Sequence, residues 1–312
     1  MIKERYGKVV KGLGGLFETR VLEDGRVERI VSRAKGNLKR DEEKVLVGDL
    51  VKLEEDPDTP DGIVISEVLT RKNALIRPPM ANLDYIFIFF AAKKPMPVLE
   101  TVDKLIAIAE HNSIEPVIVI TKADLSLAEA TRYKAIYDLA GIPCFLTSAE
   151  SGEGVGRVSE FISDKLRGGK TAAFAGASGV GKSTLMNALF PGMSLATGGI
   201  SRKIERGRHT TRHVEIFDIG EGEDAGFLAD TPGFSLIDFS RFDFFSIEDL
   251  ADTFRDLAPY RGRCRYADCA HVGEGADECA VMQAVKDGLL SESRLESYRS
   301  IYRTLKDKSK YD

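Results

Sequence analysis

The chain has no tryptophan, only four cysteines, and no apolar run long enough to cross a membrane. A membrane-spanning helix needs roughly 20 apolar residues, whereas the longest apolar stretch here, residues 85–92, has the length of one strand. The first residues, MIKERYGKVV, also lack the apolar core of a secretory signal. We therefore expect a cytoplasmic protein with no membrane partner.

The chain also lacks a net positive charge, since 44 Lys and Arg stand against 49 Asp and Glu. Residues 1–40 are the exception, with 11 basic and 5 acidic side chains, and the rest of the chain carries the acidic excess. This distribution argues against a globally basic nucleic-acid binder and favours a local contact with a polyanion. Arg29, Arg33 and Lys35 are the expected phosphate contacts, and a solvated charged surface is the alternative.

Five short apolar runs separated by glycine-rich turns fill the first ~70 residues. The expected strands are residues 6–10, 16–21, 27–32, 49–53 and 62–69. The pattern fits an OB-type barrel, a common oligonucleotide-binding fold, although an SH3-like barrel would give the same pattern. Arg71-Lys72-Asn73 and Arg77-Pro78-Pro79 then form a linker.

A complete P-loop, GASGVGKST, follows the apolar residues 172–175 and opens a helix. Its glycines let backbone N–H groups face phosphates, and the helix N-terminus adds partial positive charge. We expect Lys182 to reach the β- and γ-phosphates and the Ser183 hydroxyl to bind Mg²⁺. A glycine-rich loop with a fortuitous lysine is the alternative. The expected nucleotide contacts are Gly176, Ala177, Ser178, Gly179, Val180, Gly181, Lys182, Ser183 and Thr184.

Residues that would read a guanine base lie before the P-loop. The expected strand 117–120 ends in Thr121-Lys122-Ala123-Asp124, which is similar to the [N/T]KxD motif of GTPases. The Asp124 carboxylate can accept guanine N1–H and N2–H together, a pair that adenine does not offer. Ser148 and Ala149, after the expected strand 144–146, would back the base. A helix cap is the alternative interpretation of the four-residue match.

The parts that sense the γ-phosphate follow the P-loop. Asp230-Thr231-Pro232-Gly233 comes after the apolar residues 226–229, and we expect Asp230 near Mg²⁺ and the Gly233 N–H at the γ-phosphate. In the segment 207–211, Thr211 is a better candidate than Thr210 to complete the Mg²⁺ site. Each motif ends an expected strand, where open α/β sheets bind ligands.

The order of the motifs is circularly permuted, because ordinary GTPases begin with the P-loop. Permutation is tolerated where domain termini lie close together, and here the segment after Gly233 leads into a C-terminal domain. In Ras-like GTPases a glutamine after this glycine orients the attacking water, but Phe234 cannot do so. We expect His209 to position the water; the alternative is that His209 contacts RNA or caps the switch.

Three of the four cysteines cluster with a histidine near the C-terminus, as Cys264, Cys269, His271 and Cys279. Three thiolates and one imidazole give Zn²⁺ a closed tetrahedral shell, which predicts a structural site. The fourth cysteine, Cys144, is expected to be a buried small hydrophobe.

Helices are expected on both sides of this cysteine cluster, at residues 248–254, 280–290 and 293–310. In the last of these, Tyr298 and Tyr302 either pack or stack on bases, and packing is favoured. Three arginines form a possible phosphate-contacting rim: Arg261, Arg263 and Arg265.

Together these motifs resemble the RsgA/YjeQ family of circularly permuted GTPases over essentially the whole chain. The resemblance is carried by the barrel, Arg71-Lys72-Asn73, TKAD, GASGVGKST, GRHTT at 207–211, DTPGF and CRYADCAH. It implies an α/β protein with an N-terminal OB-type β-barrel, a circularly permuted P-loop GTPase domain and a C-terminal, mainly helical zinc-binding domain. It also implies binding to the small (30S) ribosomal subunit and its 16S rRNA, a role late in subunit assembly, and GTP hydrolysis stimulated by the subunit. Thr121, where asparagine is commoner, is the notable departure.

We therefore predict three domains: residues 1–72 (OB-fold, RNA-binding), 73–238 (GTPase) and 239–312 (zinc-binding). The expected ligands are GTP or GDP, Mg²⁺ and one Zn²⁺, and we expect a monomer. One alternative is a guanine-nucleotide-gated RNA-binding or scaffold protein in which hydrolysis is incidental. Another is an ATP-dependent kinase on a P-loop fold, which Asp124 disfavours.

Overall fold

The computed structural model describes residues 4–36, 38, 44–57, 59, 62–76, 78–190, 214–230 and 245–308, with only the backbone of Asp230. By their contacts they separate into two compact units. The first draws on residues 1–86, 160–174 and 205–234, and the second on residues 87–159, 175–204 and 235–312. Within the described ranges no helix is long and apolar enough to span a membrane.

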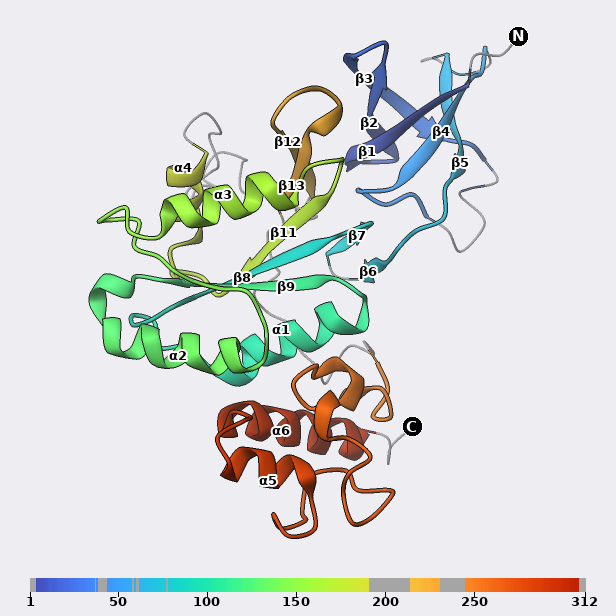
Figure 1. Cartoon of the computed structure of the whole chain (residues 1–312). Coiled ribbons are helices and arrows are strands. Elements are labelled where there is room, and N and C mark those ends of the chain that lie inside the picture. The colour runs from blue at the N-terminus through green and yellow to red at the C-terminus, as the bar shows by residue number, and fades with distance from the viewer. Residues whose placement is uncertain are drawn as a thin grey trace, which may run out of the picture. The chain divides into compact units, whose positions relative to one another are not determined.

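Five strands of the first unit close into a barrel, drawn from dark to light blue in Figure 1. Around the ring, β1 pairs with β2, β2 with β3, β3 with β5, β5 with β4, and β4 with β1. This order, with parallel pairing of β3 and β5, is that of an OB-type barrel and confirms the predicted five strands. The strands are β1 Arg5–Leu13, β2 Leu16–Glu23, β3 Arg26–Ala34, β4 Leu50–Glu55 and β5 Ile63–Val68.

The barrel is held by a core of aliphatic side chains that point inward from every strand. Because side chains alternate across a strand, one residue in two is available to this core. The inward residues are almost fully buried; they include Val9, Val21, Ile30, Val51, Leu53 and Ile65.

The linker after the barrel contains a short hairpin that the sequence did not predict, β6 (Ala74–Ile76) with β7 (Pro79–Ala81). Arg71 binds the buried Asp49 carboxylate, with Nε 2.7 Å from Oδ1. Asn73 donates to and accepts from the Leu83 backbone at 2.8 and 3.0 Å. The Arg71-Lys72-Asn73 motif therefore has a structural role in fastening the linker, while Arg77 lies outside the described residues.

A second hairpin in the first unit is bound to the barrel by strand pairing and ion pairs. Its strands are β12 (Glu215–Ile219) and β13 (Gly226–Asp230), and β12 also pairs with β1. Asp218 binds Arg20 at 2.7 Å and Arg29 at 3.0 Å, both from the barrel. Because Arg29 is already engaged here and by Glu18, we do not retain it as a phosphate contact.

A buried lysine joins the barrel to β13 and to β11 (Thr171–Gly176). The Lys8 ammonium donates to the Gly169 carbonyl at 2.8 Å and to the Thr171 hydroxyl at 2.7 Å. It also lies 4.2 Å from the centre of the Phe227 ring. Because Lys8 is only 8% exposed, burial lowers its pKa to about 8.

In the second unit, strands run in the order β10-β9-β8. They are β8 (Tyr85–Ala91), β9 (Glu115–Thr121) and β10 (Cys144–Leu146), with β9 and β10 parallel. The two longer strands are buried almost throughout, as in a parallel sheet covered on both faces. Figure 1 shows helices α1 (Leu99–His111) and α2 (Leu127–Leu139) running beside them.

The C-terminal part of the second unit ends in helices α5 (Ala280–Lys286) and α6 (Glu292–Lys308). The predicted helix 248–254 was wrong, because the chain forms only the 3₁₀ turn η3 (Leu250–Thr253) there. The Thr253 hydroxyl donates to the Leu250 carbonyl at 2.7 Å, and such a local side-chain bond competes with continuation of the helix. The predicted helix 280–290 ends early because Gly288 has a φ of 71°, which the end of a helix favours.

Candidate functional site

The P-loop connects β11 to helix α4 (Lys182–Leu189). Gly176 has a φ of +142°, and a Cβ there would lie 2.2 Å from the Phe89 carbonyl oxygen. Only glycine can therefore start this loop so close to the neighbouring backbone. The Lys182 ammonium donates to the carbonyls of Gly176 at 2.5 Å and Ala177 at 2.9 Å. Burial lowers the pKa of Lys182. Its ammonium therefore lies against the backbone of the P-loop, where it is expected to bind phosphates.

The predicted base motif is bonded directly to the P-loop. Thr121, at the end of β9 and 4% exposed, has its hydroxyl against the Val180 carbonyl and 3.2 Å from the Phe90 carbonyl. The Lys122 ammonium donates to the Gly179 carbonyl at 2.7 Å. The base motif and the P-loop are therefore joined directly, although the residues in these two contacts are 59 and 57 positions apart in the chain.

Asp124 occupies the 3₁₀ turn η1 (Ala123–Leu125) and is exposed. Within the part of the chain that the structure describes, its carboxylate has no hydrogen bond or ion pair, so it is free to accept from a ligand. The Ala123 N–H donates to the Thr147 carbonyl at 3.1 Å. This bond fixes the turn beside the loop that contains Ser148.

The loop expected to back the base is held from within. Ser148 is fully buried, and its hydroxyl accepts from the Ser151 N–H at 3.2 Å. The Ser148 N–H donates to the Glu153 carbonyl at 2.9 Å. Gly154 allows the close return of the chain, since a Cβ there would lie 1.9 Å from the Leu146 carbonyl oxygen. Ala149, next to Ser148, is half-buried.

The structure describes only some of the expected magnesium ligands. Ser183 is the second residue of α4, and Thr184 beside it is exposed. The backbone of Asp230 ends β13, which pairs in parallel with β11. His209, Thr211 and Gly233 lie outside the described residues.

Sequence reasoning did not find the loop before α1 as part of this site. The Lys122 ammonium also donates to the Lys94 carbonyl at 2.6 Å. The peptide bond between Lys94 and Pro95 is cis, and Lys94 has a φ of 55°. The cluster of prolines at Pro95 and Pro97 signals a fixed turn, but no sequence pattern links that turn to the base motif.

The four predicted metal ligands meet at one point, although the sequence spreads them over residues 264–279. Their ligand atoms lie within 4.8 Å of one another. The His271 Nδ1 is 3.5 Å from the sulfurs of Cys264 and Cys269 and 3.4 Å from that of Cys279. The sulfurs of Cys264 and Cys279 are 3.9 Å apart. Zn–S bonds of about 2.3 Å and a Zn–N bond of about 2.0 Å imply tetrahedral edges of about 3.8 and about 3.5 Å, so this donor set fits zinc.

Burial by itself favours the neutral forms of these groups. Burial lowers the pKa of His271, which keeps its imidazole neutral. Burial raises the pKa of the Cys269 thiol to about 12 and also raises that of Cys279. A bound divalent cation would supply the positive charge that stabilises the thiolates.

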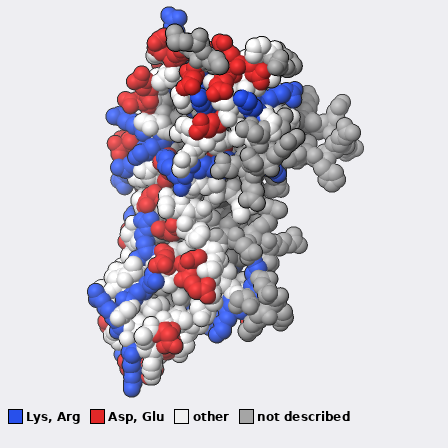
Figure 2. Space-filling view, turned by 90° about the vertical axis from the view of Figure 1, so that its right-hand side faces the viewer, with Lys and Arg blue, Asp and Glu red and all other residues white. Residues whose placement is uncertain are grey.

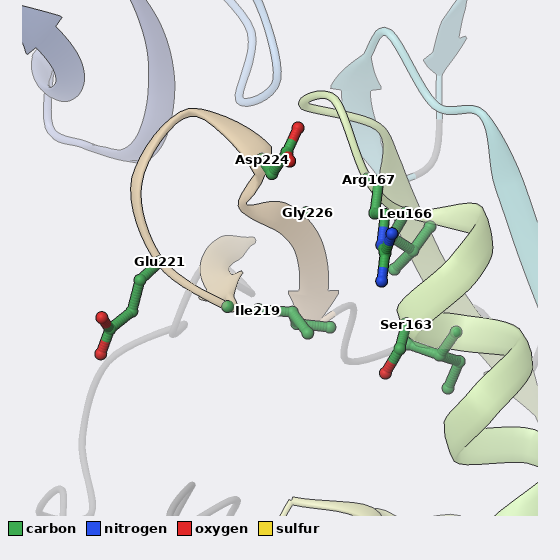
Figure 3. A pocket seen from close by; sticks show the side chains of 9 residues that line it. Ser163, Leu166, Arg167, Ile219, Glu221, Asp224 and Gly226 are labelled. Atoms are coloured by element: carbon green, nitrogen blue, oxygen red, sulfur yellow. The ribbon is translucent and has the colours of Figure 1, made fainter. Parts of the chain in front are cut away.

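The first unit also contains a pocket of about 410 Å³ that includes none of the predicted residues. It lies between the end of helix α3 (Val155–Lys165) and the turn joining β12 to β13. Its floor includes the buried side chains of Ile162 and Leu166. Figure 3 shows the Arg167 side chain beside Leu166 and Ser163, while Glu221 points away from them.

Comparison with known families gives two matches that together cover most of the chain. The model of the RsgA N-terminal domain matches residues 6–64. The model of the RsgA GTPase matches residues 68–240, which include the base motif, the P-loop and Asp230.

Full-length relatives agree with these family matches. A small ribosomal subunit biogenesis GTPase RsgA from Alkaliphilus metalliredigens is 38% identical over 98% of this chain and 99% of its own length. The small ribosomal subunit biogenesis GTPase RsgA 2 from Listeria monocytogenes is 38% identical over 97% of this chain and 98% of its own length.

Two solved structures are similar to this one over nearly their whole length. YjeQ from Thermotoga maritima has a TM-score of 0.78 at 32% identity, covering 97% of this chain and 99% of that one. YloQ, described as a circularly permuted GTPase, has a TM-score of 0.76 at 30% identity, covering 98% of this chain and 96% of that one.

Proposed function

Because this chain belongs to the RsgA GTPase family and is a GTP hydrolase, we propose that it binds the 30S ribosomal subunit and acts late in its assembly. The curated relatives are named for biogenesis of the small subunit. Contact with the subunit accelerates hydrolysis in this proposal. The observation that carries it is the similarity, over nearly the whole chain, to relatives named for biogenesis of the small subunit; the bond between Thr121 of the base motif and Val180 of the P-loop supports the nucleotide site.

We assign the nucleotide contacts as the sequence predicted them. Lys182 and the loop amides bind the phosphates, and Asp124 reads guanine. Ser183, Thr211 and Asp230 would hold Mg²⁺, which would supply positive charge beside the phosphates. The Gly233 N–H meets the γ-phosphate.

His209 is the proposed catalytic residue, because Phe234 cannot hydrogen-bond to water. An imidazole at this position can orient the attacking water, a role typically worth ~10²–10⁴-fold in rate. We expect His209→Ala to keep GTP affinity and subunit binding and to lose most of the stimulated turnover. A loss below about threefold would assign the water to another group.

We retain the domain limits 1–72, 73–238 and 239–312. The barrel and the zinc module contact 16S rRNA in this proposal, and the protein acts in the cytoplasm as a monomer. Within the described ranges, Arg33 and Arg263 have no ion pair, whereas Arg261 binds Asp252 and Arg265 lies 3.4 Å from Glu278. Figure 2 shows basic and acidic side chains interspersed on the face in view, which favours a few local phosphate contacts.

Zinc is the proposed ion of the cysteine cluster, where it would fix the loop of residues 264–279. A small module of this kind has too little apolar core to fold without its metal. Removal of zinc is therefore expected to unfold the module.

Cosedimentation of the native protein with purified ribosomal subunits tests the binding. We expect the protein to pellet with small subunits and not with large ones, more strongly with a non-hydrolysable GTP analogue than with GDP. Binding should weaken steeply with salt, because each phosphate contact releases counterions. Equal binding to both subunits, or to neither, would contradict the proposal.

A further inference from the structure

Helix α6 holds the backbone of the cysteine cluster at two adjacent peptide groups. The Tyr298 hydroxyl donates to the Ala270 carbonyl at 3.1 Å. The next residue of the helix, Arg299, donates from Nε to the His271 carbonyl at 3.1 Å. These two carbonyls belong to the metal ligand His271 and to the residue before it.

The backbone at His271 needs such support because it is in a strained conformation. His271 has a φ of 61°, in the left-handed region that L-residues other than glycine rarely adopt. That conformation aims Nδ1 at the three sulfurs, at 3.4 and 3.5 Å. Without the two hydrogen bonds, the peptide groups around His271 would be free to relax and carry the imidazole away.

Tyr298 is suited to this contact by its surroundings. It is 3% exposed, and its ring lies 6.4 Å from the imidazole of His271. Arg299 makes a second contact, with Nη2 2.8 Å from the Met282 sulfur in α5.

The helix itself is fixed one turn earlier. Arg294 binds Asp103 of α1 at 2.8 Å and Asp256 at 2.9 Å. The two donors at 298 and 299 therefore project from a helix that is also anchored to α1.

We propose that Tyr298 and Arg299 are positioning residues of the metal centre, which hold the Ala270 and His271 carbonyls so that the imidazole meets the three sulfurs. The inference rests on the proposed zinc site. Such outer contacts typically change metal affinity 10–100-fold when removed.

The same helix provides matched controls. Tyr302 and Arg303 lie one turn further along α6, and neither makes a hydrogen bond within the described ranges. Tyr298→Phe and Arg299→Gln are compared with Tyr302→Phe and Arg303→Gln, all in the full-length zinc-loaded protein. The rate of zinc transfer to a chromophoric chelator is measured well below the unfolding temperature, and Co²⁺ titrations follow the thiolate-to-metal absorption.

We expect zinc to leave Tyr298→Phe and Arg299→Gln about 10-fold faster than the native protein, and the Co²⁺ absorption to need more metal for saturation. The two controls should stay within about 2-fold of the native rate. Equal rates in all four variants would overturn the positioning role and leave the zinc site intact. A native protein that binds no zinc would overturn both proposals.

Discussion

Arg294 and Asp103 form an ion pair that solvent does not reach, with exposures of 0% and 1% and a separation of 2.8 Å. The second guanidinium nitrogen binds Asp256 at 2.9 Å. Asp103 belongs to α1, and Arg294 to the last helix of the chain. The pair therefore fastens the C-terminal helix to the helix that follows the first strand of the nucleotide-binding sheet.

Arg294→Met is expected to destabilise the protein by about 3–5 kcal/mol, because it leaves two buried carboxylates without their cation. Denaturant unfolding followed by circular dichroism measures this loss. Arg261→Met is the control, since Arg261 and Asp252 are 36% and 70% exposed and such pairs contribute about 0–1 kcal/mol. Equal effects of the two substitutions would show that burial does not set the strength of the pair at 294.

Thr121→Val is expected to weaken GTP binding several-fold, because it removes the hydroxyl that lies against the Val180 carbonyl of the P-loop. Thr121→Ser keeps the hydroxyl and should restore the affinity, which isothermal titration can measure. Thr253→Val is the matched control: this threonine is also buried, and its hydroxyl donates to the Leu250 carbonyl at 2.7 Å in the C-terminal part. Each valine substitution should lower the free energy of unfolding by about 1 kcal/mol, but only Thr121→Val should lower the affinity for GTP.

Much of this site could be predicted from sequence because its parts are local. A strand followed by a glycine-rich loop and a helix identifies the P-loop, and TKAD follows a strand of five buried residues. The five barrel strands were also found, since each is a short apolar run bounded by turn residues. Their boundaries moved by up to three residues, at the end of β1.

The contacts that join these parts could not be predicted, because they connect residues far apart in the chain. Nothing local distinguishes Arg29, bonded to Asp218 across 189 residues, from a basic side chain that faces solvent. The same holds for Tyr298, whose aromatic spacing indicated packing but not its bond to Ala270. The expected contacts at His209, Thr211 and Gly233 remain predictions.

Asp124→Asn should lower GTP affinity and raise affinity for xanthosine triphosphate, because xanthine has a carbonyl where guanine has its 2-amino group. Hydrogen bonds to a charged group contribute about 1.5–3 kcal/mol, so GTP affinity should fall roughly 10–100-fold. Competition against a fluorescent GDP measures both nucleotides. Asp138→Asn is the control, since Asp138 lies on α2 and binds Lys134. Equal affinity of the native protein for ATP and GTP would contradict the assignment of Asp124 as the residue that reads guanine.

Lys8 predicts how stability depends on pH. Its pKa is about 8 in the folded protein, against 10.5 for an exposed lysine. Between these values the unfolded chain binds the extra proton, so stability rises with pH. The difference in unfolding free energy, native minus Lys8→Met, should increase by about 3 kcal/mol between pH 7.5 and 10.5. Lys11→Met, at an exposed ion pair with Glu215, should show no such rise; a flat difference for Lys8→Met would mean that the buried ammonium keeps its ordinary pKa.

The most direct test of the proposed function is the rate of GTP hydrolysis with and without purified small subunits. We expect slow hydrolysis by the protein alone, because Phe234 stands where Ras-like GTPases have glutamine. The rate should be at least ten times higher with small subunits but not with large ones. An unchanged rate in the presence of small subunits that bind the protein would contradict it, and would leave a guanine-nucleotide-gated binding protein in which hydrolysis is incidental.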